Sequence, residues 1–149
     1  MSDSAAIPST TSLPDFGEPA FGLTKTLPGV SYQDAMDKTV AELQKVGFGV
    51  LTQIDMAATM AAKLHTDFTR PYMILGACNP QLAYRALSAI PAIGLLLPCN
   101  VVVTTDGEGN AVVSMIKPEA MFSSMIQEPG MESMVDEVTG LLTQVLDAL

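Results

Sequence analysis

The chain has 149 residues, of which 48% are hydrophobic and 15% charged, and its 16 acidic and 7 basic residues give a formal net charge of -9. A chain of this length buries about two-thirds of its unfolded surface, so one ordinary core suffices without disulfides or a metal. The apolar fraction argues against a disordered chain, and the acidic balance argues against a protein that binds nucleic acid through its phosphates. We therefore predict one globular domain with no nucleic-acid partner.

No segment of the sequence is apolar for long enough to span a membrane. The most apolar stretch, residues 89–97, has half of the roughly 18 residues that a span needs and contains Pro91 and Gly94. The first residues carry Asp3 and lack the basic and apolar regions of a secretory signal. We expect no membrane span and a cytoplasmic location, where the two cysteines of the chain remain thiols.

The acidic residues are concentrated at the two ends of the chain. Residues 1–24 hold three acids and no base, residues 118–149 hold six acids and no base, and residues 25–117 hold the other seven acids and all seven bases. Residues 1–20 are also rich in Ser, Thr and Pro and show no hydrophobic period. They are predicted to form a mobile acidic tail, and residues 21–149 a single domain.

The first half of the domain predicts two strands and two helices in alternation. A strand over residues 22–27 ends at a Pro-Gly turn signal, and Ser31 caps a helix because its hydroxyl can accept from a free amide of the first turn. This amphipathic helix ends at Gly47. Residues 48–54 alternate as in a strand, and Asp55 is predicted to cap the second helix.

The next elements begin with a short buried strand over residues 72–77. Asn79 and Pro80 then mark a helix start, because asparagine is a good N-cap and proline at the first helical position loses no hydrogen bond. That helix runs to about residue 89. The β-branched second half of residues 94–105 predicts a strand, in which Pro98 requires an edge position or a bulge.

The end of the chain predicts a hairpin and a terminal amphipathic helix. Residues 106–110 form the hairpin loop to a strand over residues 111–116, and a polar connection then runs to residue 130. The order of elements indicates an α+β fold, with a mostly antiparallel sheet and helices packed on it. The terminal helix, which packs on this sheet or on a second copy, is predicted from the spacing of its apolar residues: Val135, Val138, Leu142, Val145 and Leu149.

Two segments each place a Cys-Asn pair at a break in a strand: LGACNP at residues 75–80 and LLPCN at residues 96–100. In their order and spacing they resemble the family catalogued as domain of unknown function 302, over a core of about residues 31–116. The resemblance implies a compact α+β domain related to the TATA-binding-protein-like arrangement, often found as a dimer, with no settled activity. The candidate functional site comprises the residues at the two junctions: Cys78, Asn79, Pro80, Pro98, Cys99 and Asn100.

The two cysteines support two interpretations. Cys78 directly precedes a capped helix, whose free amides and dipole stabilise a thiolate. Free cysteine is, however, among the most buried residue types, and we favour a small buried apolar role for Cys78. If the strand at residues 72–78 pairs antiparallel with the strand at residues 94–105, Cys78 approaches Cys99. A disulfide or a shared soft metal is then geometrically possible.

Other metal-ligating residues are few. His65 is the single histidine, and a zinc site built from Cys78, Cys99 and His65 would need a further ligand. A catalytic Cys-His pair lacks an identifiable orienting group, so no catalytic residue is assigned. Thioethers bind Cu(I), but packing or an adaptable interface is favoured for the four methionines between residues 121 and 134, because no His or Cys lies beside them in the sequence: Met121, Met125, Met131 and Met134.

The sequence supports two functional hypotheses. The first is a non-catalytic, dimeric module that binds a small apolar ligand or a protein partner through the apolar residues 89–98 and the terminal helix. The second is a thiol-dependent redox or soft-metal protein that uses Cys78 and Cys99. The chain has neither a P-loop nor a dinucleotide-binding motif, and the identity of any cofactor is left unknown.

Overall fold

The computed structural model describes residues 13–65, 70–122, 126 and 128–149. It contains five strands, five α-helices and one 3-10 helix, η1, within these residues. The elements in chain order are β1 (Gly22–Leu27), α1 (Tyr32–Lys45), β2 (Gly49–Asp55), α2 (Met56–Leu64), β3 (Tyr72–Cys78), α3 (Pro80–Ala89), η1 (Pro91–Leu96), β4 (Cys99–Thr105), β5 (Ala111–Ile116), α4 (Pro118–Phe122) and α5 (Met131–Ala148).

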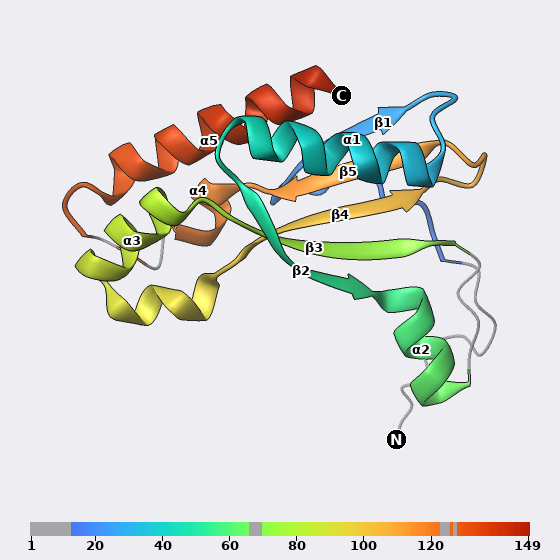
Figure 1. Ribbon diagram of the computed structural model, residues 1–149, viewed down its shortest axis with the longest axis horizontal. Coiled ribbons are helices and arrows are strands. Elements are labelled where there is room, and N and C mark those ends of the chain that lie inside the picture. Colours follow the sequence, from blue (N-terminus) through green and yellow to red (C-terminus); the bar gives the residue numbers. More distant parts are fainter. Residues whose placement is uncertain (1–12, 66–69, 123–125, 127) are drawn as a thin grey trace.

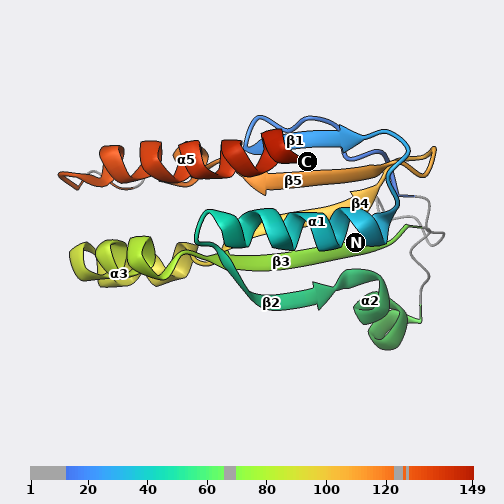
Figure 2. The same ribbon diagram turned by 45° about the horizontal axis from the view of Figure 1, so that its top comes forward.

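The strands form one sheet in the order β1-β5-β4-β3-β2, and every neighbouring pair is antiparallel. Helices α1 and α5 lie on the same face of this sheet (Figures 1 and 2), α1 against β4 and β5 and α5 against β1. Helix α3 lies beyond the end of the sheet where β3 stops, and α2 lies at the opposite end (Figure 1). The predicted α+β fold with an antiparallel sheet and a terminal helix is confirmed.

Local hydrogen bonds explain where the helices begin. The Ser31 hydroxyl accepts from the Asp34 amide at 3.1 Å, and the Asp55 carboxylate accepts from the Ala58 amide at 2.9 Å. At the start of α3, Oδ1 of Asn79 accepts from the Leu82 amide at 3.3 Å. Each side chain satisfies a backbone donor that has no partner within the helix, so all three predicted N-caps are confirmed.

The structure differs from the predicted elements in three places. Residues 91–96 form η1, and Pro98 directly precedes β4, which is a central strand. The expected edge position or bulge at Pro98 was wrong. Because Pro98 lies outside the ladder, its missing amide proton costs no strand hydrogen bond. The connection after residue 117 contains the short helix α4, and α1 ends at Lys45, two residues before Gly47.

The buried apolar residues form two clusters. The larger lies between the sheet and helices α1 and α5, and its least exposed members include Leu43, Phe48, Leu75, Val101 and Leu142. The smaller lies beyond the end of the sheet and joins α3, η1, α4 and α5 through its buried members: Ala86, Ile93, Phe122 and Met131. Helix α5 contributes to both clusters and therefore ties the smaller one to the main core.

The predicted N-terminal tail falls mostly outside the described residues, which begin at residue 13. In the part that is described, Asp15 forms an ion pair with Arg70 at 3.0 Å and accepts a hydrogen bond from the Gly107 amide at 3.0 Å. Arg70 also donates to the Pro14 carbonyl at 3.1 Å. Residues 14 and 15 therefore contact the domain beside the β4–β5 hairpin. In the described part of the chain, no helix is both long and apolar enough to cross a membrane.

Two side chains lie close to Gly76 of strand β3. A Cβ atom added to Gly76 would lie 2.8 Å from Cγ of Pro98 and would overlap Oγ1 of Thr52, the cross-strand neighbour of Gly76 on β2. Real Cβ atoms do not make such contacts, so glycine is required here for space. This requirement explains the glycine in the LGACNP segment.

We expect Gly76→Ala to lower the free energy of unfolding by about 1 to 3 kcal/mol, because the added methyl group must displace Thr52 or Pro98. Urea unfolding measures the change, and Thr52→Ala in the same chain should restore part of the loss. Gly49→Ala on β2 is the matched control, since no atom lies within 4 Å of its added Cβ. Equal stability of the Gly76→Ala and Gly49→Ala variants would contradict the packing described here.

Candidate functional site

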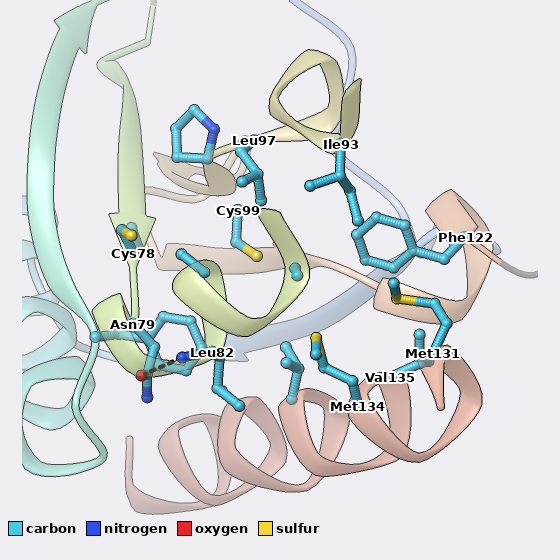
Figure 3. Close-up of a pocket in the computed structure, with 16 residues that line it drawn as sticks. Cys78, Asn79, Leu82, Ile93, Leu97, Cys99, Phe122, Met131, Met134 and Val135 are labelled. Carbon is cyan, nitrogen blue, oxygen red and sulfur yellow. Dashed lines mark hydrogen bonds between the residues drawn. The ribbon is translucent and has the colours of Figure 1, made fainter. Parts of the chain in front are cut away.

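An apolar cavity of about 50 Å³ lies where β3 and β4 leave the sheet. Its walls come from the ends of these strands and from α3, η1, α4 and α5 (Figure 3). The lining includes aromatic, aliphatic and sulfur-containing side chains, with Asn79 as the one side chain among them that carries an amide. A cavity with such walls suits an apolar or soft occupant.

The cavity occupies the seam between the two hydrophobic clusters. Phe48, Leu82 and Val138 in its wall belong to the main core, whereas Ile93 and Phe122 belong to the smaller cluster. Several lining side chains at the seam are small, so the helices cannot close the space between the clusters: Ala77, Cys78, Ala83, Ala86 and Cys99. The cavity therefore results from small residues at the point where two packed layers meet.

Both cysteines lie at this seam. Strand β3 pairs antiparallel with β4, which is the arrangement considered from the sequence, and Ala77 is the cross-strand partner of Cys99. Cys78, the next residue, is half-buried, Cys99 is 8% exposed, and both are free thiols that line the cavity (Figure 3).

Burial is the main influence on the chemistry of Cys99. Removal of this thiol from water raises its pKa from 9.0 to about 11, and the neighbouring Cys78 adds to the rise. Desolvation disfavours the charged form, so Cys99 is a neutral thiol at neutral pH. The expected role of a small buried apolar residue therefore describes Cys99 better than it describes the more exposed Cys78.

Asn79 connects two elements at the edge of the cavity. Its Oδ1 atom caps α3, and its Nδ2 atom donates to the Val46 carbonyl at the end of α1 at 3.4 Å. Gly47 has a φ of +89°, and a Cβ added there would lie 2.9 Å from Nδ2 of Asn79. The side chain of Asn79 thus holds the end of α1 against the start of α3, a role that its capping pattern alone does not reveal.

The other predicted site residues are divided between different surfaces. Pro98 lines the cavity, whereas Pro80 is exposed at the first turn of α3 and is not part of its lining. Asn100 is exposed and lines a second hollow with Phe16 and Phe21, because successive residues of β4 point to opposite faces of the sheet. His65 is the C-cap of α2, at the end of the sheet away from the cavity (Figure 1).

No sequence motif connects the methionines of the cavity with its cysteines. Met131 and Met134 of α5 line the same cavity as Cys78 and Cys99, together with Phe122 of α4 (Figure 3). More than thirty residues separate Cys99 from Met131 in the sequence. The methionines therefore have no cysteine near them in the sequence but share a cavity lining with both cysteines. Across the described residues, no group of three or more His, Cys, Asp and Glu is placed to hold a metal ion.

Together, these features define a small α+β domain with a one-sheet antiparallel core and an apolar cavity at one end. The sequence matches the family described as "Domain of unknown function DUF302" over residues 23–149, and the chain therefore belongs to this family. The match extends beyond residues 31–116, on which the resemblance was based, and takes in nearly all of β1 and the whole of α5.

The fold is also similar to that of a solved relative. The crystal structure of an uncharacterized conserved DUF302 protein from Bacillus stearothermophilus matches with a TM-score of 0.79 and 28% sequence identity. The match covers 87% of this chain and 98% of that chain. A comparison with curated proteins finds no significant match.

We expect the raised pKa of Cys99 to make the protein less stable as the pH rises from about 9 to about 11. In this interval the unfolded chain releases a thiol proton that folded Cys99 retains, so unfolding becomes more favourable. The stabilising effect is fully present below pH 9.0, the ordinary value, and is lost by about pH 11.

Urea unfolding of the wild type and Cys99→Ala across this interval tests the effect, because other groups titrate in both proteins. The stability of the wild type relative to the variant should fall by roughly 2 kcal/mol between the two limits. A difference that does not change with pH would show that Cys99 titrates normally.

Proposed function

We propose that this DUF302 domain is a non-catalytic binding module that holds a small apolar ligand in the cavity between the two hydrophobic clusters. The observation that carries the proposal is the cavity itself, whose wall is formed almost wholly by apolar and sulfur-containing side chains. An apolar cavity stays free of ordered water because its walls offer water few hydrogen-bond partners. An apolar ligand loses no hydrogen bonds on entering it.

The size of the cavity limits the ligand. At about 50 Å³ it is far below the ~300 to 1,000 Å³ of pockets that hold drug-sized molecules, so the fitting ligand has few heavy atoms. Met131 and Met134 form part of the wall, and their flexible thioether chains adapt to different shapes at low cost. These two side chains are the ones that would move to admit a somewhat longer apolar chain.

We expect xenon, a small apolar probe, to shift the methyl NMR signals of Leu82 and Ile93, which line the cavity. Ala86→Leu places a larger side chain in the wall and should reduce these shifts severalfold. Ala41→Leu, at an exposed position of α1, is the matched control and should leave them unchanged. Wild-type protein that shows no shift at these methyl groups would contradict the proposal.

The proposed module acts as a homodimer, and the surface formed by β2 and α2 supports this. Strand β2 is an edge strand, and α2 has no buried residue although most of its side chains are apolar. The exposed fractions of the large apolar side chains on this surface are 68% for Leu51, 45% for Ile54 and 62% for Leu64. Edge strands with such side chains pair readily with another strand.

The charge of this surface favours a second copy of the chain as the partner. Residues 49–64 carry one acid, Asp55, and one base, Lys63, so their net charge is zero in a chain with a net charge of -9. Two acidic copies approach with least repulsion at a neutral surface. Antiparallel pairing of two β2 edges about a twofold axis would satisfy the backbone groups of both strands and extend the sheet.

We expect Leu51→Lys to weaken this dimer at least tenfold, because the twofold axis places two unpaired lysines in the interface. Sedimentation velocity over a concentration series measures the dissociation constant. Leu95→Lys on η1 is the matched control, since Leu95 is 89% exposed and lies outside the β2–α2 surface. A monomeric wild type, or equal weakening by both substitutions, would contradict the proposed interface.

A second candidate function is thiol-dependent redox chemistry or soft-metal binding at Cys78 and Cys99. It is favoured by one specific observation, that both thiols line a single cavity. A cytoplasmic location suits this function, because free thiols persist in a reducing compartment.

A further inference from the structure

The face of the sheet opposite α1 and α5 carries a second hollow, called here the sheet hollow. Val102 and Ser114 are cross-strand partners on this face, because they alternate along β4 and β5 with Val101 and Val113 of the main core. Side chains from residues 16–21 complete the wall, and the hollow has a volume of about 110 Å³. Among the described residues, it shares no lining residue with the apolar cavity at the end of the sheet.

We propose that the sheet hollow binds a small neutral molecule of the phenol class, with one aromatic ring and one hydroxyl group. This site is separate from the cavity of the proposed function, and neither proposal depends on the other.

The size of the sheet hollow fits a single ring. An engineered protein cavity of about 150 Å³ with apolar walls binds benzene. The sheet hollow has about 110 Å³, and Phe21 in its wall is 62% exposed, so a bound ring can keep one edge in solvent. The apolar cavity at the end of the sheet, at about 50 Å³, is less than half as large.

The apolar part of the wall favours an aromatic ligand. Phe16 and Phe21 both line the hollow, and Val102 adds aliphatic surface. Aromatic rings pack against one another in offset or edge-to-face arrangements that contribute beyond the burial of their area. A ring therefore gains more from this wall than an aliphatic chain of the same size.

The charge of the site favours a neutral ligand. Among the described residues, those that line the hollow have no ionisable side chain. The carboxylate of Asp15, just before Phe16, is already paired with Arg70 at 3.0 Å and accepts a hydrogen bond from the Gly107 amide. A charged ligand would lose its water in the hollow without gaining an ionic partner.

A buried hydroxyl group in the wall can bind the polar group of the ligand. Oγ of Ser114 lies 2.7 Å from Oγ1 of Thr24, and either atom can be the donor. When Thr24 donates, the proton of Ser114 is available to an oxygen atom in the hollow, because each hydroxyl group has one proton. Gly22 leaves this oxygen accessible, since a Cβ there would lie 2.9 Å from Oγ of Ser114. The exposed side-chain amide of Asn100, in the same wall, is a second group that can bind the ligand hydroxyl.

Polar contacts hold both ends of the segment that carries the two phenylalanines. Asp15 is bound to Arg70 before the segment, and the Phe21 carbonyl at its end accepts from the Lys117 amide at 2.8 Å. The segment precedes residue 23, where the family match begins, whereas β4 and β5 lie within that match. The phenylalanines therefore add an aromatic wall to strands of the family core.

The site is tested by titration of the full chain with 4-fluorophenol, followed by NMR of the methyl groups of Val102 and Ile116, which line the hollow. These signals should shift saturably, with a Kd below about 1 mM. Phe21→Leu removes one ring and should raise the Kd by a factor of about three to ten. Tyr84→Leu, at an aromatic residue of α3 that is 74% exposed and outside the lining, is the matched control and should leave the Kd unchanged.

The hydrogen bond is tested with fluorobenzene, which has the ring without the hydroxyl group. Ser114→Ala should weaken the binding of 4-fluorophenol by a factor of about five and leave that of fluorobenzene unchanged. A purely structural effect of the substitution would weaken both equally, and that result overturns the hydrogen bond to Ser114.

The location of the ring is read from which methyl signals move. Wild-type protein without a shift at Val102 and Ile116 overturns the site. Shifts at Leu82 and Ile93 alone place the ring in the cavity at the end of the sheet and also overturn it. Equal Kd values for the wild type and Phe21→Leu overturn the aromatic wall.

Discussion

The antiparallel pairing of β3 with β4 is the interaction on which the rest of the structure depends. These are inner strands of the sheet, and their register, with Ala77 opposite Cys99, brings the end of one strand to the start of the other. Strand β3 therefore ends, and β4 begins, at the same end of the sheet; α3 follows β3, and η1 precedes β4. The chain between them contributes to the smaller hydrophobic cluster, which lies beyond the end of the sheet.

Helix α5 is what attaches that layer to the domain. At eighteen residues it is the longest element, and at ~1.5 Å of rise per residue it reaches from the main core past the end of the sheet. Val145 and Leu142 pack in the main core, while Met131 packs with the smaller cluster. At the other end of the helix, Lys25 of β1 donates to the Leu146 carbonyl at 3.1 Å, where a cation complements the helix dipole. The cavity remains where the two packed regions meet.

The same geometry brings apolar and sulfur-containing side chains to the wall of the cavity. Cys99 is held as a neutral thiol by burial, and the single histidine of the chain lies at the opposite end of the sheet. The side chain of Asn79, at the edge of the cavity, makes its hydrogen bonds to backbone atoms at the end of α1 and at the start of α3. The wall of the cavity is otherwise formed by apolar and sulfur-containing side chains.

Sequence alone determined the features that depend on neighbouring residues. Ser31, Asp55 and Asn79 cap their helices through contacts three residues away, and the strands follow from local patterns that survive folding. Only the tertiary structure decided that Pro98 precedes a central strand, that α2 is left without a buried face, and that Met134 lines the same cavity as Cys99. These outcomes depend on strand register and on the path of α5, which bring together residues too distant in sequence for any local pattern to record.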